Sequence, residues 1–197
     1  MIEFLEEIDR SIVLAVNSWN TPILDEIMWW ISARITWVPL YIFLLYLAFR
    51  FFDKITFIKF IFFVVAAVVI SDLVSVHLFK NLFLRYRPSH HVHLMKQLHF
   101  YQIKPGEYYR GGTYGFVSSH AANFFTVMTA VLLAFKGHYS FLKWLLPLIG
   151  ILICFSRIYL GVHYMSDIIA GAAVGAAIAW VLYRFWFRTV FKSEELC

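Results

Sequence analysis

Cysteine is scarce in this chain, which has two among its 197 residues. Cys154 lies within an apolar run and Cys197 is the last residue, so we expect no structural disulfide between them. No cysteine spacing typical of a zinc site is present either. The chain also lacks the basic start of a secretory signal peptide, because it begins with acidic residues such as Glu3, Glu6 and Asp9. No cleaved leader is therefore expected.

Charge is low as well, because Asp, Glu, Lys and Arg make up 15% of the chain, whereas hydrophobic residues make up 61% and aromatic residues 20%. A soluble domain of this length does not need so much apolar surface, and long apolar runs are typical of membrane-spanning helices. The composition therefore predicts an all-α integral membrane protein, folded as a single membrane-embedded domain over residues 1–197. We expect no nucleic-acid partner.

Five apolar segments are long enough to cross a bilayer, since each is near the roughly 20 residues that a spanning helix needs. The predicted spans are Leu24–Phe49, Ile55–Phe79, Ser118–Phe135, Phe141–Leu160 and Met165–Phe187. Residues 1–19 differ, because apolar residues recur there at helical spacing opposite a charged face. We expect this segment to form an amphipathic helix that either lies in the membrane interface or packs against the bundle.

Positive charge predicts the orientation of the bundle. The turns and the tail on one side carry Arg50, Lys54, Lys59, Lys136, Lys143, Arg184, Arg188 and Lys192. By the positive-inside rule this side is cytoplasmic, and five spans then place the N-terminus outside. The opposite side holds the long outer loop, residues 86–116. This loop is also basic, which weakens the assignment of orientation unless its basic residues take part in binding or catalysis.

Polar residues gather where the predicted spans end on the outer side. Alternate ends of helical hairpins share a face, so the fold would bring together Lys80, Arg85, Arg87, Ser118, Ser119, His120, Arg157, His163 and Asp167. Arginine offers planar paired donors that match phosphate oxygens, and a helix N-terminus presents free N–H groups to an anion. Serines at a helix N-terminus are commonly plain caps, but beside these cations phosphate binding is the better interpretation.

His163 and Asp167 are four residues apart, so on a helix they would share one face. A carboxylate bonded to one ring nitrogen fixes the tautomer and raises the basicity of the other, which suits a nucleophilic imidazole. A purely structural link between them is equally compatible with the spacing. His120 across the site would protonate a leaving oxygen. A nucleophile, an acid and an anion clamp together indicate phosphoryl transfer.

Three motifs relate this cluster to a known family. The segments "KNLFLRYRP" (Lys80–Pro88) and "SRIYLGVHYMSD" (Ser156–Asp167) resemble the first and third elements of the type 2 phosphatidic acid phosphatase superfamily. The family's second element is usually Pro-Ser-Gly-His. It corresponds here to "VSSH", with Val117 at the proline position and Ser119 at the glycine position.

The resemblance implies a metal-independent phosphatase, without a cofactor, that acts on a lipid phosphate or diphosphate. It implies that His163 attacks phosphorus and forms a phosphohistidine, that Asp167 orients it, and that His120 protonates the leaving group and then activates water. The residues that it implies for phosphate binding are Lys80, Arg87, Arg157 and Ser118. Our own interpretation of the helix start adds Ser119, and Arg85 is a weaker candidate for a headgroup contact.

We therefore expect a multi-pass protein of a bacterial-type inner membrane, with its site on the periplasmic side and a substrate that arrives sideways from the leaflet. Candidate substrates are undecaprenyl diphosphate, phosphatidylglycerol phosphate, phosphatidic acid and the phosphate of lipid A, among which the sequence does not choose. Two alternatives stay open: a phosphotransferase that passes the phosphoryl group to another lipid or sugar, and a transporter or binding protein for phosphorylated lipid. The oligomeric state is open as well.

Several residues outside the motifs carry separate predictions. Arg34 and Asp72 are charges at similar depth inside spans, so we expect a bridge between them, unless they line a water-filled pocket. A small-residue face predicts close packing inside the bundle, or alternatively a dimer seam: Gly171, Ala172, Gly175 and Ala176. The tryptophans expected as interfacial anchors are Trp29, Trp30, Trp37, Trp180 and Trp186. Headgroup contact or solvent exposure is the preferred interpretation, over metal binding, for His90, His91, His93 and His99.

Overall fold

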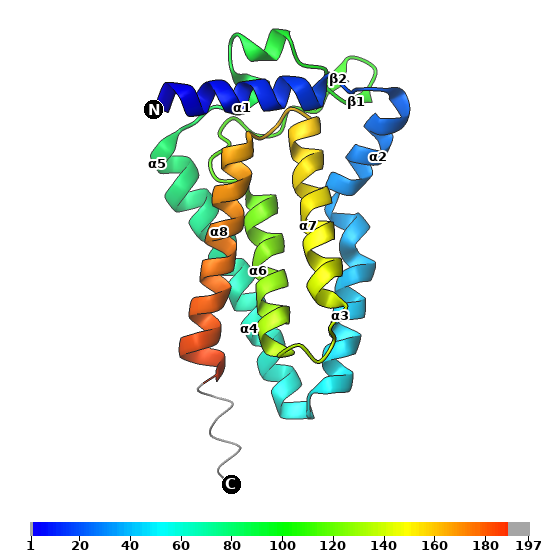
Figure 1. Ribbon diagram of the computed structural model, residues 1–197, viewed down its shortest axis with the longest axis vertical. Helices are drawn as coiled ribbons and strands as arrows, with labels where there is room; N and C mark the ends of the chain where they lie inside the picture. The colour runs from blue at the N-terminus through cyan, green and yellow to red at the C-terminus, as the bar shows by residue number, and fades with distance from the viewer. Residues whose placement is uncertain (1, 189–197) are drawn as a thin grey trace.

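The computed structural model describes residues 2–188 and shows a bundle of long helices with one helix lying across its end (Figure 1). The predictions for Lys192 and Cys197 concern residues outside this range. The helices are α1 (Ile2–Asn17), α2 (Pro22–Ser32), α3 (Val38–Phe51), α4 (Lys54–Leu73), α5 (Asn81–Phe83), α6 (Ser119–Ala134), α7 (Leu142–Tyr159) and α8 (Met165–Leu182). Strands β1 (Gln102–Lys104) and β2 (Glu107–Tyr108) form an antiparallel hairpin in the outer loop.

The predicted all-α membrane bundle is confirmed. Within residues 2–188, four helical stretches are long and apolar enough to span a membrane: Arg34–Phe51, Lys54–Phe83, Leu142–Tyr159 and Met165–Phe187. The shorter apolar helix α6 contacts α4, α7 and α8 and so lies among them. The second stretch runs past α4 through a π-helical turn, Val74–Lys80, into α5, so it extends beyond the predicted end at Phe79.

The prediction of one continuous first span, Leu24–Phe49, is wrong. Helix α2 ends at Ser32, the backbone of Ala33 is extended, and α3 begins at Val38 after one 3-10 turn. Because apolar periodicity continues across this region, hydropathy alone gives no sign of the interruption. The break divides the first membrane segment into an upper and a lower helix (Figure 1).

Two side chains bond the backbone carbonyls that the break frees. The Thr36 hydroxyl donates to the carbonyl of Trp30 at 2.6 Å, and Trp37 Nε1 donates to the carbonyl of Ile31 at 2.8 Å. Irregular backbone at membrane depth is tolerated where such partners satisfy it. Trp37 therefore serves to hold the break, which differs from the interfacial anchoring that we expect from its sequence position.

Glycines let α8 pack directly on the backbone of α6. A Cβ at Gly171 would lie 2.6 Å from the carbonyl oxygen of Ser118, and one at Gly175 would lie 2.0 Å from that of Ala122. Both glycines are buried inside the bundle, so the packing interpretation is confirmed for these two residues. This contact also places the start of α6 beside α8, where the Ser118 N–H donates to the carbonyl of Asp167 at 3.0 Å.

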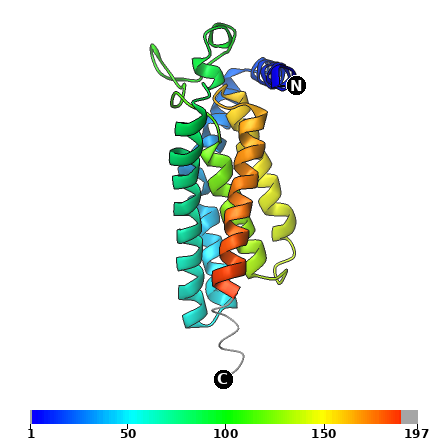
Figure 2. The same ribbon diagram turned by 90° about the vertical axis from the view of Figure 1, so that its left-hand side faces the viewer.

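Helix α1 crosses the end of the bundle, and Figure 2 shows it end-on. Its inner face is tied to the bundle: Val13 is fully buried, and the Asn17 amide donates to the carbonyl of Tyr159 at 2.7 Å. The packing alternative for residues 1–19 is thus confirmed. Phe4 and Leu5 are exposed on its other side, which leaves an apolar edge for the interface as well.

The two ends of the bundle differ in what they carry (Figure 1). Helix α1 and the outer loop lie at one end. The α3–α4 turn with Arg50, the α6–α7 turn with Lys136, and the end of α8 lie at the other. The predicted segregation of the basic turns from the outer loop is therefore present in the fold.

Candidate active site

Arg85 and Arg87 are held by an extended segment that follows α5. The Arg87 N–H donates to the carbonyl of Thr113 at 3.1 Å, and the Gly115 N–H donates to the carbonyl of Arg85 at 2.9 Å. Residues i and i+2 of an extended chain face the same side. Both guanidinium groups therefore turn inward toward the start of α8, while Tyr86 between them is exposed.

His163 lies in the turn between α7 and α8 and is 1% exposed. Arg87 Nη1 lies 3.0 Å from His163 Nε2, and because a guanidinium can only donate, Nε2 is the acceptor. The ring proton is then on Nδ1, which faces Asp167 Oδ2 at 3.4 Å. Burial first, and then the charges of Arg87 and Arg157, lower the pKa of His163 well below 6.5. The ring is therefore neutral, with its lone pair on Nε2.

Asp167 is fully buried, and both of its carboxylate oxygens are bonded. Oδ2 accepts from the Tyr164 N–H at 3.0 Å, and Oδ1 accepts from Arg85 at 2.8 Å. Arg85 also donates to Asp9 of α1 at 2.8 Å and to the Ser166 hydroxyl at 2.6 Å. These bonds engage the guanidinium inside the protein, whereas the sequence suggests a headgroup contact. We correct that interpretation: Arg85 holds Asp167.

The hydroxyls of Ser118 and Ser119 have different environments. Lys80, at the end of the π-helical turn, donates to Ser119 Oγ at 2.8 Å, so the serine at the family's glycine position contacts the motif lysine. Ser118 makes no capping bond to α6, and its buried Oγ has no hydrogen-bond partner within the described chain. Plain capping is therefore wrong for Ser118. A buried hydroxyl without a partner is costly, and an anion would satisfy it.

Arg157, near the end of α7, is the most buried cation of the cluster, with 2% exposure. Its Nη atoms donate to the hydroxyl of Ser32, from the helix break, and at 2.9 Å to that of Tyr109, from the outer loop. Its Nε is buried and has no hydrogen-bond partner among residues 2–188. Arg157 therefore keeps one donor for a ligand while two distant segments fix its plane.

His120 lies in the first turn of α6 and lines two cavities, which we call the His120 cavities. Their volumes are about 240 and 260 Å³. Ser32 and Arg34 line both of them. Ser119 lines the first and Arg157 the second, so both cavities adjoin the phosphate cluster.

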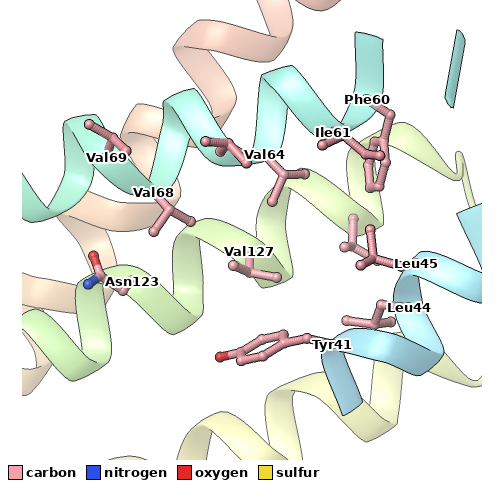
Figure 3. A pocket seen from close by; sticks show the side chains of 12 residues that line it. Tyr41, Leu44, Leu45, Phe60, Ile61, Val64, Val68, Val69, Asn123 and Val127 are labelled. Carbon is pink, nitrogen blue, oxygen red and sulfur yellow. The ribbon is translucent and has the colours of Figure 1, made fainter. Parts of the chain in front are cut away.

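An apolar groove of about 420 Å³ runs between α3, α4 and α6, and we call it the lateral groove (Figure 3). It shares Tyr41, Val68 and Asn123 with the first His120 cavity. On its α4 wall, Val65 and Val69 are exposed toward the outside of the bundle. The site therefore connects with the side of the protein that faces lipid.

The predicted bridge between Arg34 and Asp72 is wrong. Asp72 accepts a hydrogen bond from the Asn123 amide at 3.0 Å. The Arg34 side chain makes no ion pair or hydrogen bond within residues 2–188, and it lines the His120 cavities. The alternative of a charge that lines a pocket is therefore the correct one for Arg34.

The outer loop packs on α2 through aromatic rings. Trp29 stacks on Tyr101, with ring centroids 4.6 Å apart, and meets Tyr109 edge-on at 4.9 Å, so it is a packing residue and not an anchor. His99 pairs with Asp25 of α2 at 2.8 Å, and its side chain is exposed, which agrees with the predicted alternative of solvent exposure. Three of the expected anchors, Trp30, Trp180 and Trp186, have exposed side chains.

The chain is similar in sequence to known proteins. The profile of the PAP2 superfamily matches residues 60–191. The chain is 35% identical over 189 residues to a lipid A 4′-phosphatase of Porphyromonas gingivalis, covering 94% of this chain and 75% of that protein. It is 30% identical over 183 residues to a lipid A 4′-phosphatase of Bacteroides thetaiotaomicron, covering 93% and 79%.

Two solved structures share the fold. The transmembrane PAP2-type phosphatidylglycerolphosphate phosphatase of Bacillus subtilis superposes with a TM-score of 0.64, at 19% identity, over 91% of this chain and 85% of that one. The LpxE structure of Aquifex aeolicus superposes with a TM-score of 0.61, at 23% identity, over 90% and 96%. At these identities the likeness concerns the arrangement of the helices.

Proposed function

The chain belongs to the PAP2 superfamily and is a lipid phosphatase of bacterial membranes, and we propose that it removes the 4′-phosphate of a lipid A-type glycolipid. Among the lipid phosphates that the sequence leaves open, this one is favoured by the two lipid A 4′-phosphatases, which align with over nine-tenths of the chain. Hydrolysis is preferred over phosphotransfer because both relatives are named as phosphatases.

The observation that carries the proposed mechanism is the set of buried donors around a neutral His163. Ser118 Oγ and Arg157 Nε are buried without partners in the described residues, and Arg87 donates directly to His163 Nε2. A phosphate held by these donors would have its phosphorus beside the Nε2 lone pair. Fixed charges in a site shielded from water stabilise the transition state strongly because they need no reorganisation.

In the first step, the Arg87 N–H leaves His163 Nε2 and donates to a phosphoryl oxygen, which frees the Nε2 lone pair. His163 Nε2 then attacks phosphorus, the N–P bond forms, and the bond from phosphorus to the sugar oxygen breaks. His120 gives its proton to that leaving oxygen. In the second step, a water attacks the phosphohistidine and passes a proton to His120, and the N–P bond breaks to release phosphate. Asp167 holds the Nδ1 proton throughout, while Lys80 and Arg157 neutralise charge on the phosphoryl oxygens.

The position of the site supports a substrate that arrives from the leaflet. An acyl chain in the lateral groove would bring the headgroup to His120, because groove and cavity share wall residues. The site also lies at the end of the bundle opposite the basic turns (Figure 1). By the positive-inside rule this is the periplasmic end. We therefore place the reaction at the outer face of the inner membrane.

The test is phosphate release by purified protein from lipid A, phosphatidylglycerol phosphate, phosphatidic acid and undecaprenyl diphosphate. We expect the highest kcat/KM on lipid A, with losses of about 10³-fold or more in His163→Ala and His120→Ala, since each removes a reacting group. Arg50→Gln, at the far end of α3, is the matched control. Release unaffected by His163→Ala would contradict the mechanism, and preference for another lipid would contradict the substrate.

A further inference from the structure

The break between α2 and α3 carries a cation that the proposed reaction does not use. Arg34 is the first residue of a membrane-spanning stretch, Arg34–Phe51, and its side chain makes no ion pair or hydrogen bond within the described chain. A charged side chain inside a span is costly unless it meets a counter-charge or water, and such residues commonly mark a path or site for a ligand.

The structure fixes where this cation lies relative to the catalytic groups. Arg34 lines both His120 cavities. Ser32, two residues before it, bonds Arg157, and the side chains of Thr36 and Trp37 bond the backbone before the break. The break is therefore a tied conformation that directs Arg34 toward the cavities.

The two histidines do not line the same cavities. Within the described residues, His163 and Arg87 line neither of the His120 cavities. In phosphoryl transfer the attacking and leaving atoms lie roughly in line on opposite sides of phosphorus. If His163 attacks, the cavities on the side of His120 receive the leaving group, which is the remainder of the lipid.

We propose that Arg34 binds a second anionic group on the part of the lipid that leaves, so that the enzyme selects headgroups with a further phosphate or carboxylate. This inference rests on the proposed function, because it needs His120 on the leaving-group side. A guanidinium suits this role, since its planar donors match the oxygens of either anion.

The lateral groove supports the same placement. Its apolar walls begin at Tyr41, Val68 and Asn123, which also line the cavity that Arg34 faces. Tyr41 and Asn123 mark this junction in Figure 3. A lipid with its chain in the groove would place its headgroup in the cavity that both Arg34 and His120 line. Arg34 therefore lines the cavity that adjoins the lateral groove, where the headgroup of a lipid would join its acyl chain.

The experiment compares two lipids that differ only in the second anion: lipid A with both phosphates, and lipid A that retains the 4′-phosphate alone. We expect Arg34→Gln to reduce kcat/KM on the first lipid by about 10- to 100-fold, as for loss of a charge-assisted contact, and on the second by less than about 3-fold. Arg34→Lys should recover part of the difference. Arg50→Gln is the control for loss of one positive charge from the same membrane-spanning stretch, Arg34–Phe51.

Hydrolysis of either lipid by the unaltered enzyme tests the proposed function. The effect of Arg34→Gln on the ratio of kcat/KM between the two lipids tests the role of Arg34. The proposed function and the inference about Arg34 can therefore be contradicted independently. Equal losses on both lipids would overturn the inference, because Arg34 would then serve the scissile phosphate or the fold. Equal activity of Arg34→Gln and the unaltered enzyme on both lipids would overturn it as well. Melting temperatures of Arg34→Gln and Arg34→Lys in the same detergent show whether the structure around the break is preserved.

Discussion

At the scale of single residues, the neighbours of His163 decide which form of the ring is present. Arg87 donates to Nε2, and Asp167 faces the Nδ1 proton. The two contacts select one tautomer, and burial removes the hydration that a charged ring would need. A neutral imidazole with its lone pair directed at a bound phosphate is the form that nucleophilic attack requires.

We predict that the acid limb of the pH profile of kcat/KM lies below pH 6.5, the ordinary pKa of the imidazole. The pKa of His163 is lowered, so the ring takes up a proton and loses its nucleophilic lone pair only when the pH falls below that value. Initial rates measured from about pH 4 to about pH 8 locate the limb, because kcat/KM reports groups of the free enzyme. A limb at or above pH 6.5 would contradict this environment for His163.

Gly115 leaves the space in which Arg87 and Asp167 approach each other. A Cβ there would lie 3.0 Å from Asp167 Oδ2 and 3.1 Å from Arg87 Cγ. We predict that Gly115→Ala lowers kcat/KM by about 10-fold or more, because small displacements of catalytic groups are costly. Gly112→Ala is the matched control, since nothing lies within 4 Å of its Cβ position. Equal activity of the two variants would show that the site adapts.

Motif spacing predicts most of the phosphate cluster but not what supports it. Lys80, Arg87 and Arg157 lie close enough for their charges to interact, because the segments that carry them end at the same face of the bundle. The link from Arg85 to Asp9 joins residues 76 positions apart, which no local pattern reveals. A signal for Asp9 does exist, because it lies on the same helical face as Val13, where a carboxylate needs a partner.

At the scale of elements, the interface of α6 and α8 is set by residues without side chains. Gly175 places the α8 backbone against Ala122, and its own carbonyl accepts from the Thr126 hydroxyl at 3.1 Å. The small-residue spacing predicts this packing, because only small residues let two backbones approach closely in a membrane. The break in the first span has no comparable signal in the sequence. The side chains that bond its free backbone carbonyls are of types that also occur in uninterrupted spans.

Gly175→Ala tests how closely the two helices must pack. The added methyl would lie 2.0 Å from the Ala122 carbonyl oxygen, so α8 must move. We predict a loss of about 1–3 kcal/mol in unfolding free energy, the usual cost of overpacking. Thermal or denaturant unfolding in detergent measures it. Ala177→Val, on the exposed side of the same helix, should change stability by less than about 0.5 kcal/mol. Equal stability of both variants would argue against a tight interface.

At the scale of the whole molecule, the catalytic residues and the basic turns that set membrane orientation lie at opposite ends of the bundle. The catalytic cluster lies below α1 and the outer loop, and the basic turns lie at the far end (Figure 1). Hydropathy predicts this architecture because each residue that faces lipid must be apolar, so the spans can be recognised from composition alone. The contacts of α1 and the outer loop with the bundle are not predictable in this way, because they depend on tertiary packing between polar segments.

Cysteine labelling in intact spheroplasts tests which end faces outward. In a Cys197→Ser background the remaining Cys154 is buried, so single cysteines can be introduced at exposed positions. Lys104→Cys in the β1–β2 hairpin and Ser140→Cys in the α6–α7 turn are the matched pair. A membrane-impermeant maleimide should label Lys104→Cys directly and Ser140→Cys only after permeabilisation. The opposite labelling pattern would show that the protein has the reverse orientation in the membrane, with the phosphatase site on the cytoplasmic side.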